Sequence, residues 1–202
     1  MTTTLNTPEE VVNYALKRIG HPFRVTNILD GSRASLAALD VYGQTRDALL
    51  TETDWDFAER VTVGNLLKQA PDSYVTNPWT PAYPALNWRF EYTFPTDALK
   101  IRGVRYQAVT IPNFDPRYCR FSIDNDSGYT PPAKVILTNV PNAIIIYTGQ
   151  ITDPNQWTAS FLDAFADRLG KSIAPTLTGM EPTKLAAAEQ QADEPTAVVT
   201  RT

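Results

Sequence analysis

Apolar residues recur at helical spacing in three parts of the chain. The first begins at Thr7-Pro8-Glu9-Glu10, a typical helix start in which Thr7 caps the first turn and Glu10 completes a capping box, and it ends at Gly20. The second runs from Ala34 to Leu49, and the third starts after Asp153. The apolar face of the second consists of Ala34, Ala37, Ala38, Val41, Tyr42, Thr45, Ala48 and Leu49. The apolar face of the third consists of Trp157, Phe161, Leu162, Phe165, Ala166, Leu169 and Ile173. Spacings of three and four predict amphipathic helices that pack on one another.

Between residues 88 and 148 the apolar period changes to two, which is typical of half-buried strands. Aromatic and polar side chains alternate from Trp88 to Phe94. In the next strand, the inward-facing residues switch from odd-numbered to even-numbered positions after Gly103, so we expect a β-bulge there. Further strands are expected at 118–124, 135–138 and 143–148. In the first of these, Cys119 shares a face with Phe121 and Ile123, which indicates a core thiol rather than a reactive one.

These patterns predict an α+β fold. We expect an antiparallel helical bundle with an inserted antiparallel β-sheet module of four to five strands and an extended C-terminal tail. Residues 1–67 are assigned to the first part of the helical domain, and 68–150 to an aromatic loop and the β module. Residues 151–180 are assigned to the closing helix, and 181–202 to the tail.

A short acidic stretch, 52–56, comes directly after the second helical pattern. We expect Trp55 and Phe57 to be buried where two helices meet, as core residues rather than ligand contacts. Glu52, Asp54 and Asp56 supply the carboxylates that glycoside hydrolysis needs, but their position favours helix caps and solvated charges.

Residues 68–87 form a loop rich in proline and aromatic residues. Prolines at this density exclude regular structure, and so many aromatics indicate a loop that packs on its own domain or on a partner. Tyr74, Trp79, Tyr83 and Trp88 lie in or beside it, and they leave a carbohydrate-binding module open as an alternative.

Composition and charge narrow the possible functions. The chain has 202 residues, of which 43% are hydrophobic and 20% charged, and its net charge is −4. A surface that grips duplex DNA is therefore not expected, since this needs clustered Lys and Arg. One cysteine excludes an intrachain disulfide framework. The N-terminal residues lack the pattern of a secretory signal, and we expect a protein made in the cytoplasm.

Candidate catalytic and metal-binding groups are few. His21 is the one histidine and abuts Pro22, which favours an ordinary position near a helix end. Asp124 and Asp126 open like a calcium loop, but Val135 stands where a bidentate Glu belongs. Asn125-Asp126-Ser127 matches a glycosylation acceptor without a secretory context. We therefore expect no enzyme, no cofactor and no metal site.

Several segments, taken in order, match the pattern of one family. The first helix carries Asn13-Tyr14-Ala15-Leu16 and ends in Ile19-Gly20, and a long helix runs into Arg46-Asp47-Ala48-Leu49-Leu50. Further along stand Trp55-Asp56-Phe57-Ala58, Tyr92 to Leu99 with a Pro-x-Asp turn, Ile101-Arg102-Gly103-Val104 and Ile145-Ile146-Tyr147-Thr148, before the helix with Trp157 to Phe165. Over about residues 8 to 175 the chain resembles the tail tubular protein A family, the head-to-tail connecting adaptors of short-tailed, podovirus-like bacteriophages.

The resemblance implies a structural virion protein of the tail or neck, assembled in the host cytoplasm. It implies a ring of twelve copies that lies under the portal protein, extends the DNA ejection channel and docks the tail nozzle or tube protein. Double-stranded DNA would pass through without specific binding. The tail resembles the C-terminal arms with which such adaptors bind the portal, and Leu185, Val198, Val199 and Arg201 are its candidate portal-binding residues. Two alternatives stay open: a carbohydrate-binding or carbohydrate-cleaving tail module, and a neck protein of a longer-tailed phage.

Overall fold

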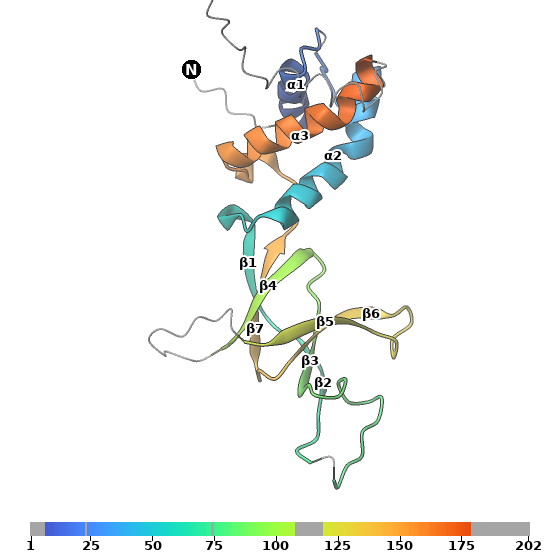
Figure 1. The fold of residues 1–202 in the computed structure, drawn as a ribbon, viewed down its shortest axis with the longest axis vertical. Coiled ribbons are helices and arrows are strands. Elements are labelled where there is room, and N and C mark those ends of the chain that lie inside the picture. The colour runs from blue at the N-terminus through green and yellow to red at the C-terminus, as the bar shows by residue number, and fades with distance from the viewer. Residues whose placement is uncertain (1–6, 23, 74, 108–118, 179–202) are drawn as a thin grey trace, which may run out of the picture. The chain divides into compact units, whose positions relative to one another are not determined.

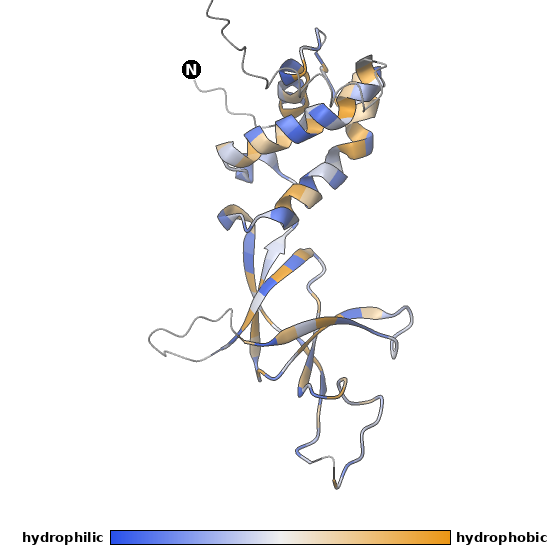
Figure 2. Ribbon diagram, viewed as in Figure 1, coloured by the Kyte–Doolittle hydropathy of each residue, from blue (hydrophilic) through white to orange (hydrophobic). Residues whose placement is uncertain are grey.

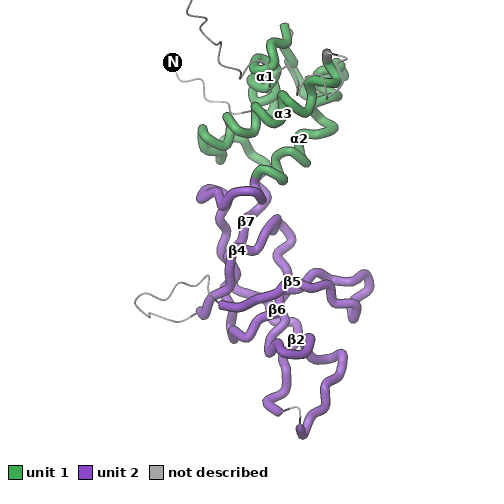
Figure 3. Tube along the Cα trace, in the orientation of Figure 1, with its two compact units in different colours: residues 1–49, 152–202 green, residues 50–151 purple. Residues whose placement is uncertain are grey.

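The computed structural model describes residues 7–22, 24–73, 75–107 and 119–178 (Figure 1). Within them, the chain forms three α-helices, α1 (Pro8–Arg18), α2 (Arg33–Glu52) and α3 (Ala159–Thr178). The strands are β1 (Glu59–Val63), β2 (Leu66–Gln69), β3 (Phe90–Thr93), β4 (Ala98–Tyr106), β5 (Phe121–Asp126), β6 (Ala133–Thr138) and β7 (Ala143–Gly149). Two short 3-10 turns, η1 (Asp56–Ala58) and η3 (Pro154–Gln156), precede β1 and α3. The chain divides into two compact units: residues 1–49 with 152–202, and residues 50–151 (Figure 3).

The expected fold class is wrong. The described residues form seven strands in two antiparallel sheets together with three helices, and they do not form a helical bundle with one inserted module of four to five strands. The difference begins at β1 and β2, which fall where we expected the helical domain to continue and the loop to start. Val61, Thr62 and Val63 are three consecutive β-branched residues, so this stretch favours a strand.

The first unit contains α1, α3 and most of α2. The capping box at the start of α1 is confirmed, since the Glu10 N–H donates to Thr7 Oγ1 and the Thr7 N–H donates to Glu10 Oε2. Hydrophobic residues alternate with polar ones along each helix (Figure 2). Most of the expected apolar faces of α2 and α3 are buried; among the residues expected there, Val41, Ala48 and Leu162 are half-buried. The aromatic cluster of this unit consists of Tyr42, Trp157, Phe161 and Phe165. Trp157 lies just before α3 rather than inside it.

The second unit consists of two sheets. Sheet A has the strand order β1-β7-β4, sheet B has the order β2-β3-β6-β5, and all pairings are antiparallel. Residues of both sheets share one core cluster: Phe90, Tyr92, Ile101, Val104, Ile136, Val140, Ala143, Ile145 and Tyr147. The expected bulge at Gly103 is confirmed, because the β4–β7 register shifts between Ile101 and Gly103. Cys119 is half-buried against this core, and burial raises the pKa of its thiol. Ile123 is 42% exposed and is therefore not the core residue that we expected.

Gly64 joins β1 to β2 where the backbone passes close to a buried ring. A Cβ atom there would lie 2.7 Å from Cδ1 of Tyr92, whose side chain is buried, and 3.1 Å from the Ala143 carbonyl. We therefore expect Gly64→Ala to lower the free energy of unfolding by about 1–3 kcal/mol. Gly43 is the control, since nothing lies within 4 Å of an added Cβ in α2. Gly43→Ala should raise stability by roughly 0.5–1 kcal/mol. Urea denaturation of both variants tests this, and equal effects would contradict it.

Candidate functional site

The joint between α2 and β1 carries the aromatic pair that the sequence singles out. Trp55 and Phe57 lie on either side of the start of η1, with ring centroids 6.1 Å apart, and both are half-buried. The element after them is a strand, so the expected burial between two helices is wrong. The neighbouring strands supply polar contacts around this turn.

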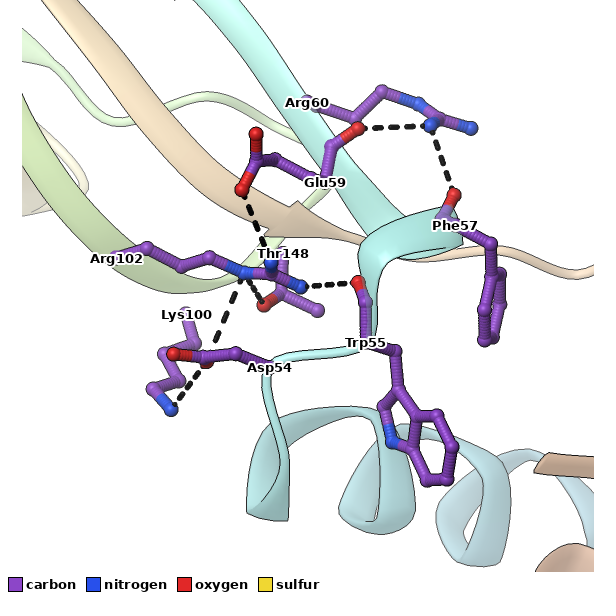
Figure 4. Close-up of polar contacts among 8 residues, drawn as sticks. All are labelled: Asp54, Trp55, Phe57, Glu59, Arg60, Lys100, Arg102 and Thr148. Carbon is purple, nitrogen blue, oxygen red and sulfur yellow. Dashed lines mark hydrogen bonds and ion pairs between the residues drawn. The ribbon is translucent and has the colours of Figure 1, made fainter. Parts of the chain in front are cut away.

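Arg102 of β4 is the centre of these contacts (Figure 4). Its side chain is only 5% exposed. Its Nη2 donates to the Trp55 carbonyl over 2.6 Å, and its Nε donates to Thr148 Oγ1 over 2.8 Å. Its Nη1 donates to Glu59 Oε2 over 3.2 Å, and Asp54 Oδ1 lies 3.7 Å from Nε. A buried guanidinium is stable only when paired and hydrogen-bonded, and this one meets both conditions.

Two further cations hold the same turn. Lys100 Nζ donates to Asp54 Oδ1 over 2.9 Å, and Arg60 Nη1 donates to the carbonyls of Phe57 and Glu59 (Figure 4). Asp54 therefore pairs with two cations of β4, and because its own side chain is 54% exposed it remains a solvated charge, as expected. These contacts connect the backbone of the turn at residues 54–59 to the strands of sheet A.

Four of the segments that carry the family resemblance meet in this unit. Arg102 of the Arg-x-Val strand binds Trp55 and Thr148, which belong to two other segments. Tyr147 Oη donates to Oδ1 of Asp97, the acidic residue of the Pro-x-Asp turn, over 3.0 Å. Segments separated by about forty to fifty positions thus contact one another directly.

Residues 59–69 contain one edge strand of each sheet and are called the 59–69 edge. β1 is an edge strand of sheet A and β2 is an edge strand of sheet B, and only Gly64 and Asn65 separate them. Val61, Val63 and Leu66 are 52%, 57% and 47% exposed along this edge. Natural sheets usually protect an edge with charges or prolines, so an exposed apolar edge indicates a surface for pairing with another chain.

The backbone of this edge is oriented for such pairing. The Gly64 N–H donates to the Ala143 carbonyl, which sets the alternation of hydrogen bonds between β1 and β7. By that alternation, the N–H and C=O groups of Val61 and Val63 point away from β7. An extended strand from another polypeptide is the chemistry that this edge would accept.

Two of the aromatic residues considered for carbohydrate binding have partners within the chain. Trp79 donates its indole N–H to the Pro84 carbonyl over 2.8 Å. The ring of Trp88 is covered by the Arg120 guanidinium, 5.1 Å from its centroid. Tyr74 lies outside the described residues.

The remaining candidate residues have ordinary surroundings or lie beyond the described ranges. His21 lies at the C-terminal end of α1, where its N–H donates to the Leu16 carbonyl. In the segment that opens like a calcium loop, Asp126 is bound by Lys68, and the Asp124 carboxylate accepts the Asn125 N–H. Within the described ranges, no group of three His, Cys, Asp or Glu side chains is placed to hold a metal ion. The candidate portal-binding residues Leu185, Val198, Val199 and Arg201 lie outside the described residues.

In the part of the chain that the structure describes, none of the helices is both long and apolar enough for a membrane span. No model of a known protein family matches the sequence. A comparison with curated proteins also found no match.

Proposed function

We propose that this chain is a structural virion protein, a head-to-tail adaptor that forms a ring under the portal protein. In this proposal the ring has twelve copies, extends the DNA channel and docks the tail nozzle or tube protein. DNA passes through it without specific binding, and the net charge of −4 agrees with a channel wall that does not hold DNA.

The observation that carries the proposal is the contact between segments that the family pattern contains. A chance likeness of short sequences gives no reason for those segments to touch. Here Arg102 joins Trp55 to Thr148, and Asp97 accepts a hydrogen bond from Tyr147. These contacts support the view that the quoted residues form one structural element, which is what a shared fold requires.

A closed ring needs two different complementary surfaces on each subunit. The exposed edge at residues 59–69 is our candidate for one of them, because it offers both apolar side chains and outward backbone groups. We propose that a strand of the neighbouring copy pairs with this edge.

Charged residues on the edge test this assignment. We expect Val61→Lys combined with Val63→Lys to abolish assembly of the purified protein while leaving its fold intact, because lysines block edge pairing and both positions are exposed. Val75→Lys is the matched control, since Val75 is 94% exposed in the aromatic loop. Sedimentation velocity gives the assembled mass, alone and with portal rings. Normal assembly of the double variant would contradict the assignment of the 59–69 edge as a ring contact, but it would not bear on the proposed binding to the portal.

A further inference from the structure

Sheet B carries a charged cluster on the face turned away from the shared core. Lys68 of β2 pairs in register with Glu91 of β3, so both side chains lie on one face, opposite the face of the core residues Phe90 and Tyr92. Asp126, at the end of β5, reaches the same cluster. The exposed fractions of the side chains of Lys68, Glu91 and Asp126 are 14%, 3% and 16%. None of them belongs to the joint around Arg102.

The three side chains are bound to one another. Lys68 Nζ donates to Asp126 Oδ2, and it lies 3.7 Å from Glu91 Oε1. The other Asp126 oxygen accepts the N–H of Gly128 over 2.8 Å. Tyr129, in the turn between β5 and β6, places its ring 5.4 Å from the Lys68 ammonium. One ammonium group therefore lies beside two carboxyl groups, so the cluster is neutral only when one of the two carboxyl groups carries a proton.

This cluster joins strands that are not neighbours in the sheet. In the order β2-β3-β6-β5, two strands separate β2 from β5. Three strand spacings amount to about 14 Å in a flat sheet. Contact between Lys68 and Asp126 thus requires the end of the β5–β6 hairpin to curl toward β2, and their side chains hold it there.

The charge balance at Glu91 is unfavourable when it is ionised. Among the described residues its Oε1 atom has no hydrogen-bond partner. Burial raises the pKa of Glu91 to about 7, with Lys68 opposing and Asp126 adding to the rise. Burial favours a higher pKa for Asp126 as well, but its hydrogen bonds with Lys68 and Gly128 lower it overall. β6 adds no charge at this point, because its residue paired with Glu91 is Leu137.

We propose that Lys68, Glu91 and Asp126 form a proton-controlled latch, which holds the β5–β6 hairpin against β2 when Glu91 is protonated and loosens when Glu91 is ionised. In the protonated state the Glu91 carboxyl shares a hydrogen bond with the Asp126 carboxylate, and Lys68 balances the one remaining negative charge. Loss of the proton leaves two carboxylates against one ammonium in a buried place, so the hairpin contact weakens.

The direction of the pH effect is set by the raised pKa. The folded protein holds the Glu91 proton more tightly than the unfolded chain, whose ordinary value is 4.5. Stability from this group is therefore complete below about pH 4.5 and is lost as the pH rises toward 7. Asp126 acts in the opposite sense, but only as the pH falls below its ordinary value of 3.8. Above about pH 5, the stability of the cluster therefore changes with the protonation of Glu91 and not with that of Asp126.

The test compares the wild type with Glu91→Gln between about pH 5.5 and about pH 8. In the wild type we expect the unfolding equilibrium constant to rise at least about tenfold over this range. Hydrogen exchange in β5 and β6, corrected for its intrinsic pH dependence, should rise with it. Glu91→Gln should remove both changes, because the amide keeps the shape and carries no titrating proton.

Asp72→Asn is the matched control, since the side chain of Asp72 is 96% exposed in the same unit, and it should keep the wild-type pH dependence. Wild-type hairpin exchange that does not change with pH would overturn the latch. So would a Glu91→Gln variant that keeps the full pH dependence. The wild-type measurement decides the matter even if the variant does not fold.

Discussion

Replacing Arg102 by methionine is expected to lower the free energy of unfolding of residues 50–151 by about 2–3 kcal/mol. Methionine fills much of the same volume but donates no hydrogen bonds. The Trp55 carbonyl and Thr148 hydroxyl would lose their guanidinium donor, and Glu59 and Asp54 would lose a cation. Urea denaturation monitored by tryptophan fluorescence measures this, because Trp55 lies at the joint.

Lys100→Met is the matched control for this effect. Lys100 also binds Asp54, but its side chain is 40% exposed, so its ion pair should contribute no more than about 1 kcal/mol. If the two variants lose similar stability, the joint does not depend on the buried guanidinium. That result would also weaken the support that the Arg102 contacts give to the proposed function.

Truncating Phe165 is expected to have the largest effect in the helical unit. Its ring, which is fully buried, packs edge-on against Tyr42 at 5.0 Å and against Trp157 at 5.2 Å, and lies parallel to Phe161 at 6.1 Å. Phe165→Ala would leave a cavity among three aromatic rings, at a cost of about 3–5 kcal/mol. Differential scanning calorimetry of the variant measures the loss.

Leu29→Ala is the control in this unit, because Leu29 is 75% exposed and its truncation should change stability by less than about 0.5 kcal/mol. A Phe165→Ala protein as stable as Leu29→Ala would mean that the aromatic cluster does not form the core of the helices.

Long periodic segments were predictable from the sequence. The apolar stripes of α2 and α3 extend over several turns, so their helical period is unambiguous, and the capping box marks the start of α1. Strands β3, β4, β6 and β7 were expected close to their observed positions. β1 and β2 were missed because both are short and follow directly on a helical pattern, which was extended through them.

The contacts of the site were beyond sequence reasoning for a different reason. Arg102 reaches Thr148 because the bulge at Gly103 shifts the register of β4 on β7, and a bulge changes which side chains share a face. Lys68 meets Asp126 only because sheet B curls across two intervening strands. Both contacts depend on tertiary geometry that no local spacing contains. The exposed edge at residues 59–69 was missed together with its strands.

The most direct test of the central proposal is the mass of the purified protein, alone and after mixing with its cognate portal ring. The adaptor proposal predicts a complex heavier than the portal ring by twelve copies of this chain. A chain ending at residue 182 should lose this binding, because the proposed portal contacts Leu185, Val198, Val199 and Arg201 would be missing. A protein that stays monomeric and never associates with the portal ring would contradict the proposal and favour the glycan-binding alternative.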